Sequence, residues 1–373
     1  MNRYVVWKSN EPAFARRDGT RHERMEFLNW RGKLVNLSRI NKILVVQPKP
    51  FGDVLLTSAY LPALRRRFPR ARIDFFVAKP YDRMVYKHPA LDNVLAANMR
   101  SGKWYVLDRL VSFWMVFKRH YDLVIDQNAS TTSSQIVALS GARYRLGYSS
   151  GQSAMFSNIK AEYGPTKYNA AKRYDMLKPF GIEEEPVQLF FYISEQEQAF
   201  ADGWIRANGL SGKKIALYSP GTTYHYKAWK TDCFAELADR VAQGTNLATV
   251  LIWGPNERHY AETMAGYMKT PAFILPRLTL GQAGALLKRA TFLFCNDGGL
   301  YHLAVATKTP TLGFFGSVEI IAWSAQGFVP THFHLNNPNY KLEPERHFGF
   351  TAADALDRFK QIAPNFGIQV KDV

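Results

Sequence analysis

Residues 294–304 read Phe-Cys-Asn-Asp-Gly-Gly-Leu-Tyr-His-Leu-Ala and predict a strand that runs directly into a helix. Asp297 and two glycines, Gly298 and Gly299, stand at the junction, and His302 follows one turn into the helix. The first amides of a helix have no partner within the helix, and glycines leave them uncovered, so such a junction can hold an anion. We therefore interpret it as a seat for a diphosphate. The alternative is an ordinary strand-to-helix turn of an α/β protein.

A second loop carries groups that suit the same ligand. It follows a predicted strand at 214–218 and reads Ser-Pro-Gly-Thr-Thr at 219–223. The hydroxyls of Thr222 and Thr223, the backbone amides and Lys227 can all donate to phosphate oxygens, and Lys227 would oppose the charge that develops on a leaving group. The loop can equally be a turn followed by a helix cap.

Two acidic residues, Asp53 and Glu257, are further candidates for a functional site. Asp53 opens a predicted helix after the strand at 42–46. A carboxylate there commonly caps the first turn, and it is equally suited to act as a base facing a cleft. Sequence position does not separate these roles. Glu257 lies just past the strand that ends at Trp253, where a carboxylate can accept from ribose hydroxyls or be a solvated loop residue.

The wider pattern predicts an α/β fold with parallel sheets. Short apolar runs alternate with amphipathic segments, and a strand-helix-strand order implies right-handed crossovers. The predicted strands are 42–46, 72–77, 121–126, 214–218, 248–253, 292–295 and 311–315, and the predicted helices are 53–68, 104–120, 234–242 and 280–290. A chain of 373 residues exceeds one ordinary core and suits two domains.

The domain boundary is expected at residues 181–186, an acidic stretch typical of a linker. We expect a basic N-terminal extension at 1–40, a Rossmann-like domain at 41–185, a second at 186–345, and a C-terminal helical segment at 346–373 that can pack back on the first domain. Two such sheets form a cleft, and ligands of open α/β sheets bind beyond the carboxyl ends of the strands.

The predicted helix at 104–120 carries a stripe of large aromatic residues, Trp104, Phe113, Trp114 and Phe117. These residue types settle at membrane interfaces when a helix lies on a bilayer. A stripe of this kind is more often buried in a protein core, and that interpretation is favoured here.

The net charge of +17 and the isoelectric point near 9.7 are the outliers of the composition. They predict attraction to a polyanion: nucleic acid, an anionic membrane face or a phosphorylated substrate. No helix-turn-helix, zinc-finger or RNP signature is present, so a nucleic-acid-binding protein would rest on charge alone. For residues 1–40 we favour a solvated, partly ordered extension over a membrane-binding or partner-binding arm.

The cysteine content and the length of the apolar runs indicate in which compartment of the cell the protein works. The two cysteines, Cys233 and Cys295, indicate neither a disulfide framework nor a zinc site. The first residues lack the apolar core of a signal peptide, and no apolar run approaches the roughly 18 to 20 residues that span a bilayer. We expect a cytoplasmic protein that is at most peripheral on the inner membrane.

Three motifs together resemble those of glycosyltransferase family 9, whose best-known members are the lipopolysaccharide heptosyltransferases. The resemblance runs from about residue 41 to residue 315. Its motifs are ILVV at 43–46 with GDVLLT at 52–57, PGTT at 220–223 with KAW at 227–229, and NDGGLYHLA at 296–304 with TPT at 309–311. Each is weak alone, but their order and placement at strand ends make the set fairly specific.

The resemblance implies a GT-B architecture of two facing Rossmann-like domains, in which the first mainly binds the acceptor and the second mainly binds an ADP-activated sugar. It implies that Asp53 is the general base. The implied donor-binding residues are Thr222, Thr223 and Lys227 at the diphosphate, Glu257 near the ribose, and Asp297, Gly298, Gly299 and His302 at the junction.

This chain departs from the family at Gly298, where the family usually has Thr or Ser. The departure puts a hydrogen bond to the donor in doubt, although the backbone cradle is kept. On the acceptor side the candidates are Lys49, in the loop at 47–51, and Arg65 and Arg66, in the last turn of a predicted helix. A solvated helix end is the alternative account of the two arginines.

The predicted function is an inverting, metal-independent transfer of a sugar, heptose from ADP-heptose, to a phosphorylated glycolipid such as the inner core of lipopolysaccharide. Asp53 would take the proton of the acceptor hydroxyl while Lys227 stabilises the departing diphosphate. No cofactor is implied besides the nucleotide-sugar substrate. The rival functions are a silent nucleotide-sugar binder, a nucleic-acid-binding protein, and a nicotinamide dehydrogenase, for which the turn at 47–53 has one glycine where three are needed.

Overall fold

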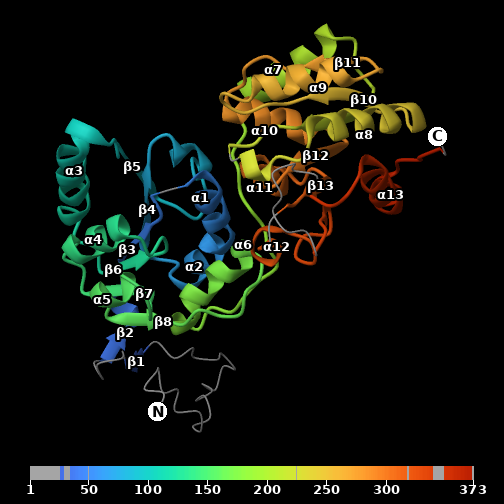
Figure 1. Ribbon diagram of the computed structural model, residues 1–373. Helices are drawn as coiled ribbons and strands as arrows, with labels where there is room; N and C mark the ends of the chain where they lie inside the picture. Colours follow the sequence, from blue (N-terminus) through green and yellow to red (C-terminus); the bar gives the residue numbers. More distant parts are fainter. Residues whose placement is uncertain are drawn as a thin grey trace. The chain divides into compact units, whose positions relative to one another are not determined.

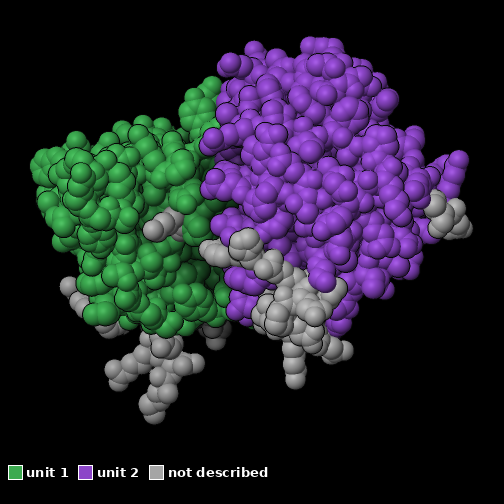
Figure 2. Space-filling model, turned by 45° about the horizontal axis from the view of Figure 1, so that its top comes forward, with its two compact units in different colours: residues 1–165, 170–185 green, residues 166–169, 186–373 purple. Residues whose placement is uncertain are grey.

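The computed structural model describes residues 26–28, 34–48, 50–223, 225–316, 319–338 and 348–371. The chain divides into two compact units, shown in green and purple in Figure 2. Unit 1 comprises Met1–Pro165 and Ala170–Glu185, and unit 2 comprises Thr166–Asn169 and Pro186–Val373. The short segment Thr166–Asn169 thus belongs to unit 2, although the residues on both sides of it belong to unit 1.

Unit 1 is built on a six-stranded parallel sheet with the strand order β5-β4-β3-β6-β7-β8 (Figure 1). Its strands are β3 (Lys42–Val46), β4 (Arg72–Ala78), β5 (Asn93–Ala97), β6 (Leu123–Asp126), β7 (Tyr144–Tyr148) and β8 (Ile159–Ala161). Most residues of β3, β4 and β6 are buried. Central strands that are covered on both faces read as continuous apolar runs, which is why the sequence predicted these three.

The helices of unit 1 surround this sheet. They are α1 (Phe51–Thr57), α2 (Leu61–Arg67), α3 (Tyr105–Phe117), α4 (Thr131–Leu139), α5 (Ser153–Phe156) and α6 (Asn169–Lys172). The 3-10 helices are η1 (Leu37–Arg39), η2 (Ser58–Tyr60), η3 (Tyr81–Met84), η4 (Gly102–Trp104) and η5 (Arg173–Phe180). Before them, β1 (Glu26–Leu28) pairs antiparallel with β2 (Leu34–Asn36). This pair lies in the predicted N-terminal extension, whose first 25 residues are outside the described part of the chain.

The sequence predicted one continuous helix at 53–68, and this prediction is wrong. The structure has α1, the 3-10 turn η2 and then α2 in its place. Pro62 lies in the first turn of α2, where the missing N–H of proline is tolerated, whereas it would interrupt the hydrogen bonds of a continuous helix. The three arginines Arg65, Arg66 and Arg67 do lie in the last turn, as the sequence predicted.

The prediction that the aromatic stripe of residues 104–120 is core is also wrong. Trp104, Trp114 and Phe117 are exposed, and Phe113 is half-buried. The buried residues of α3 are Asp108, Ser112 and Val116. The helix therefore turns a mostly polar strip inward and its apolar strip outward.

Unit 2 repeats the architecture with the strand order β11-β10-β9-β12-β13-β14, again all parallel. Its strands are β9 (Ile215–Ser219), β10 (Ala248–Leu251), β11 (Ala272–Ile274), β12 (Phe292–Asn296), β13 (Thr311–Phe314) and β14 (His332–Leu335). Its helices are α7 (Glu195–Ala207), η6 (His225–Lys227), α8 (Thr231–Gly244), α9 (Arg258–Tyr267), α10 (Leu280–Arg289), α11 (Gly299–Thr307), α12 (Ile320–Trp323), α13 (Ala352–Ile362) and η7 (Ala363–Phe366). The predicted α/β class with parallel sheets is confirmed.

The C-terminal helix α13 belongs to unit 2. It packs against α8, and its residues Phe359 and Ile362 are part of the apolar core of that unit. Phe359 contacts Phe292 and Phe294 of β12, with ring centres 5.0 Å from each. Its buried face therefore completes the second core. The expectation that this segment also packs back on the first domain stays a prediction.

No helix among the residues with described structure is both long enough and apolar enough to cross a membrane.

Candidate functional site

The junction singled out from the sequence lies where β12 ends and α11 begins. Asp297 is buried directly after β12, and its backbone N–H donates to the carbonyl of Phe314 at 3.1 Å. Helix α11 starts at Gly299. Its N-cap residue is Gly298, which has no side chain to bond to the amides of the first turn. The first amides of α11 are therefore left for a ligand or solvent.

Lys227 is held at this junction by an ion pair. Its Nζ lies 2.5 Å from Oδ2 of Asp297 and 5.6 Å from the ring centre of Trp323. The side chain of Lys227 is 19% exposed and that of Asp297 is 4% exposed. The structure thus brings together two predicted residues that are 70 positions apart, and it leaves the ammonium group partly accessible to an anion.

Asn296 fixes the loop that carries Lys227, a role for which the sequence analysis named no residue. Its side-chain amide donates to the carbonyl of Pro220 at 2.8 Å, and its Oδ1 accepts from the backbone N–H of Trp229 at 2.9 Å. The indole of Trp229 is buried against Phe314, with ring centres 4.6 Å apart. Both sides of the 220–229 loop are therefore anchored to β12.

Thr222 lies next to Gly298, while Thr223 is exposed. A Cβ placed on Gly298 would be 3.7 Å from Oγ1 of Thr222, an ordinary contact, and no other heavy atom would lie within 4 Å. The φ of Gly298 is 175°, which is extended backbone that any residue adopts. The site therefore has room for the hydroxyl that the family usually places here.

We expect Gly298→Ser to add a hydroxyl donor to the predicted diphosphate seat. The affinity for a nucleoside diphosphate should rise about 3-fold to 10-fold, the effect of one added hydrogen bond. The free energy of unfolding should change by only a few tenths of a kcal/mol, because Ser is as good an N-cap as Gly or better. Calorimetric titration and thermal unfolding measure the two effects. Gly298→Ala is the control, and an equal gain in affinity for Ala would contradict a role for the hydroxyl.

Glu257 lies beside the same loop and is fixed by two glycines. Its Oε2 accepts from the N–H of Gly254 at 3.1 Å, and a Cβ on Gly254 would come within 2.8 Å of that oxygen. A Cβ on Gly221 would lie 2.9 Å from the Cβ of Glu257. Burial raises the pKa of Glu257 above its ordinary value. The hydrogen bond from Gly254 lowers this pKa, but its effect is smaller than that of burial. The carboxylate is thus positioned in the sheet-end region that the sequence predicted for it.

His302 is buried one turn inside α11. Its Nδ1 lies 3.0 Å from the hydroxyl of Tyr168, and the two rings stack with centres 5.8 Å apart. Trp323 lies on the same side, with its ring centre 6.0 Å from that of His302. Burial raises the pKa of Tyr168 well above its usual range, so its hydroxyl keeps its proton. No local sequence pattern indicates Tyr168, which belongs to the short segment Thr166–Asn169.

Asp53 lies in the first turn of α1 in unit 1, and it is not the cap of that helix. The N-cap residue is Pro50. The carboxylate of Asp53 accepts from the guanidinium of Arg173, which comes from η5, 120 positions further on. The second guanidinium nitrogen of Arg173 donates to the carbonyl of Gln127 at 3.4 Å. Both side chains are largely buried, so Asp53 sits in a fixed position with a cationic partner that the sequence analysis missed.

The environment of Arg173 is rich in tyrosine. Tyr60 and Tyr148 are buried, and their burial raises the pKa of each hydroxyl while the charge of Arg173 acts in the opposite direction. The ring of Tyr148 stacks on that of Tyr163 with centres 3.8 Å apart. The partner of Asp53 thus lies within electrostatic reach of two buried tyrosine hydroxyls.

The predicted acceptor-side residues take three different positions. Arg65 donates to the carbonyl of Ala71 at 2.5 Å and to that of Ala90 at 3.1 Å, and pairs with Asp92 at 2.5 Å. Arg66 pairs with Glu185 at the surface. Lys49 lies outside the described residues. The contacts of the two arginines hold unit 1 together locally, and their binding of an acceptor stays a prediction.

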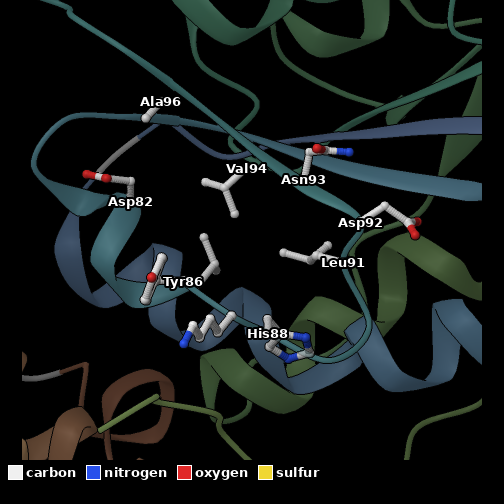
Figure 3. Close-up of a pocket in the computed structure, with 10 residues that line it drawn as sticks. Asp82, Tyr86, His88, Leu91, Asp92, Asn93, Val94 and Ala96 are labelled. Carbon is white, nitrogen blue, oxygen red and sulfur yellow. The ribbon is translucent and has the colours of Figure 1, made fainter. Parts of the chain in front are cut away.

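A pocket of about 370 Å³ opens elsewhere in unit 1, between η3 and β5 (Figure 3). Asp82, Tyr86, His88 and Asn93 are among the residues that line it. Burial lowers the pKa of His88 to about 4, so its ring is neutral near pH 7. None of the site residues predicted from the sequence lines this pocket.

Two parallel α/β units, with a lysine and an uncapped helix at the strand ends of the second, have the architecture of the GT-B fold. The model of glycosyltransferase family 9 (heptosyltransferase) matches residues 111–346. The chain belongs to glycosyltransferase family 9.

Named relatives agree with this assignment. Lipopolysaccharide heptosyltransferase 1 of Pseudomonas aeruginosa is 27% identical over 311 residues, which cover 80% of this chain and 84% of that protein. Lipopolysaccharide heptosyltransferase 3 of Escherichia coli is 23% identical over 312 residues, which cover 79% and 88% of the two chains.

Solved structures show the same fold. A glycosyltransferase of family 9 from Veillonella parvula superposes with a TM-score of 0.76 at 18% identity, covering 87% of this chain and 97% of that chain. The heptosyltransferase WaaC of E. coli with ADP superposes with a TM-score of 0.67 at 20% identity, covering 87% and 99%.

Proposed function

We propose that this protein is an inverting, metal-independent transferase that moves heptose from ADP-heptose to a phosphorylated glycolipid such as the inner core of lipopolysaccharide. The observation that carries the proposal is the ion pair of Lys227 with Asp297 beside the uncapped start of α11. The choice of sugar and nucleotide comes from the relatives, which are named lipopolysaccharide heptosyltransferases and include a structure solved with ADP-2-deoxy-2-fluoro heptose.

On the donor side, the proposed site supplies positive charge where a diphosphate would leave. Lys227 is a compact cation with three donors, so it can keep one bond to Asp297 and direct another at a phosphate oxygen. The amides of α11 and the hydroxyl of Thr222 would add neutral donors. Glu257, whose carboxylate is fixed between Gly221 and Gly254, would accept from the ribose hydroxyls.

On the acceptor side, Asp53 would act as the general base. Arg173 binds one of its carboxylate oxygens, which leaves the other to take a proton. In the proposed step the acceptor oxygen forms a bond to the anomeric carbon as its proton passes to Asp53. The bond from that carbon to the diphosphate breaks, and its electron pair leaves with the diphosphate, which Lys227 and α11 stabilise.

The charge of the chain supports an anionic acceptor at a membrane. A net charge of +17 favours phosphorylated sugars and the anionic face of a bilayer over neutral acceptors. We therefore propose that the protein works in the cytoplasm in peripheral contact with the inner membrane.

A panel of ADP-, UDP-, GDP- and dTDP-linked sugars tests the donor. An ADP-linked heptose at about 100 times its dissociation constant should stabilise the fold by about 2.7 kcal/mol, seen as a rise in the melting temperature. Mass spectrometry of a heptose-free lipopolysaccharide acceptor should then show one added heptose. Stabilisation by a UDP-, GDP- or dTDP-sugar alone would reject the proposed donor, and stabilisation without any transfer would favour a silent nucleotide-sugar binder.

A further inference from the structure

Helix α3 presents an apolar strip to solvent. Val106, Leu107, Leu110, Val111, Trp114 and Phe117 are all exposed, and their spacing of three and four residues places them along one side of the helix. We call these six residues the outer face of α3. Leu110 is 58% exposed and Trp114 is 62% exposed. Isolated exposed apolar residues are ordinary, but a contiguous strip of six large ones marks an interaction surface.

The buried side of α3 explains why the apolar strip faces outward, because specific polar residues of the helix are bonded beneath it. Asp108 is buried, and its carboxylate accepts from the guanidinium of Arg100 at 2.8 and 3.0 Å and from the Arg100 backbone N–H at 2.9 Å. The hydroxyl of Ser112 is also buried and donates to the carbonyl of Asp108 at 2.7 Å. Only Val116, with the half-buried Phe113 and Met115, joins the apolar core beneath the helix. Local bonds therefore satisfy the polar strip, and the apolar strip is left outside.

The surroundings of the outer face are basic. Residues 100–120 contain five lysines and arginines and one acidic residue, Asp108, which is the buried one. Lys103 and Lys118 are exposed at the two ends of the helix. Arg100 and Arg109 lie over the rings of Trp104 and Tyr105, at 4.6 and 4.8 Å from the ring centres. Exposed aromatic residues flanked by cations are typical of helices that lie in the headgroup region of a bilayer.

The position of α3 leaves this strip open within its own unit. In Figure 1 the helix lies at the margin of unit 1, and its helical neighbour there is α4. Phe117 lies against the turn that ends α4, since a Cβ on Gly141 would be 3.3 Å from its ring.

We propose that the outer face of α3 docks the protein on an anionic lipid bilayer. The apolar side chains insert at the level of the headgroups, and the exposed Lys103 and Lys118 contact lipid phosphates. A second copy of the chain is the poorer occupant, because joining two outer faces would bring their basic rims together. The inference gives a surface to the membrane contact proposed above, and it is independent of which sugar is transferred.

Vesicle sedimentation of the full chain, without any nucleotide sugar or lipopolysaccharide, tests this surface. We expect binding to vesicles of phosphatidylglycerol and phosphatidylethanolamine and little binding to phosphatidylcholine alone. The double variant Leu110→Ser, Trp114→Ser should bind the anionic vesicles at least about tenfold more weakly. Its melting temperature should match that of the wild type, since both side chains are exposed. Tyr267→Ser, which removes an aromatic residue that is 58% exposed on α9 of unit 2, is the matched control and should bind normally.

The basic rim is tested in the same assay. Lys103→Gln and Lys118→Gln should each weaken binding about fivefold and reduce its dependence on salt, whereas Lys288→Gln in the last turn of α10 should not. Failure of the wild type to bind anionic vesicles, or equal binding by the double variant, would overturn the proposal. So would a dimer in light scattering without lipid that the double variant converts to a monomer, because the outer face would then be a contact between copies. Failure of the donor panel would leave this result unchanged, so the two proposals can fail separately.

Discussion

Asp53→Asn is expected to lower kcat by about 10³-fold while leaving the affinity for the nucleotide-sugar donor within a factor of two. Removal of a general base costs 10² to 10⁴ in rate. Asn can still accept from Arg173, so the geometry of the ion pair is largely retained. The measurement is kcat from the appearance of the nucleoside diphosphate, together with donor affinity by calorimetry.

A matched control separates catalysis from folding in this experiment. Asp82→Asn neutralises another aspartate of unit 1, in η3 at the pocket of Figure 3, and should leave kcat unchanged. Equal melting temperatures of the two variants would exclude unfolding as the cause of a lower rate. Full turnover by Asp53→Asn would show that another group takes the proton.

Lys227→Met is expected to reduce kcat/KM by about 10² to 10³-fold, because it removes the cation proposed to stabilise the leaving diphosphate. The change has a second effect that follows from the ion pair. Asp297 is almost fully buried, so it would be left as an uncompensated charge, and the free energy of unfolding should fall by about 3 kcal/mol. Steady-state kinetics and denaturant unfolding measure the two losses.

The double variant Lys227→Met, Asp297→Asn distinguishes the two effects. Neutralising Asp297 should recover most of the lost stability, whereas the rate should remain low because the cation is still missing. Lys288→Met, on the surface of α10, controls for the loss of a lysine as such. Recovery of activity along with stability would mean that Lys227 acts only by holding the fold.

The central strands of both sheets could be predicted because each is marked by a run of apolar residues in the sequence itself. β3, β9 and β12 are apolar except at one end, β4 is interrupted only by Asp74 after its first residues, and the structure has all four at nearly the predicted positions. The edge strands β5, β8, β11 and β14 are short and only partly buried, so they carry a weaker signal and were not predicted. The meeting of Lys227 with Asp297 follows from the same rule, since β9 and β12 are neighbours and the loops after them emerge at one edge.

The residues that were missed depend on contacts that no local pattern encodes. Arg173 pairs with Asp53 across 120 positions, and Tyr168 reaches His302 across 134. Asn296 could have been found, because a side-chain amide at the end of a parallel strand is well placed to bind the loop after the neighbouring strand. The predicted general-base and donor-binding roles of the site residues themselves remain predictions.

Helix α3 illustrates a different limit of sequence patterns. The helical period of α3 places Leu107, Leu110 and Trp114 on one side, but a period alone does not say which side faces the core. That choice depended on Arg100 and Asp108, whose bonds make a polar strip suitable for burial.

The assignment of Thr166–Asn169 to unit 2 bears on any attempt to produce the halves separately. The polypeptide passes from one unit to the other at three places, around residues 165, 169 and 185. A fragment beginning at Pro186 would lack Tyr168, and His302 would lose a stacked ring together with a hydrogen-bond partner. Truncation at the acidic stretch would therefore damage the half that it is meant to isolate. A version that retains residues 166–169 through a short joining loop would keep His302 covered.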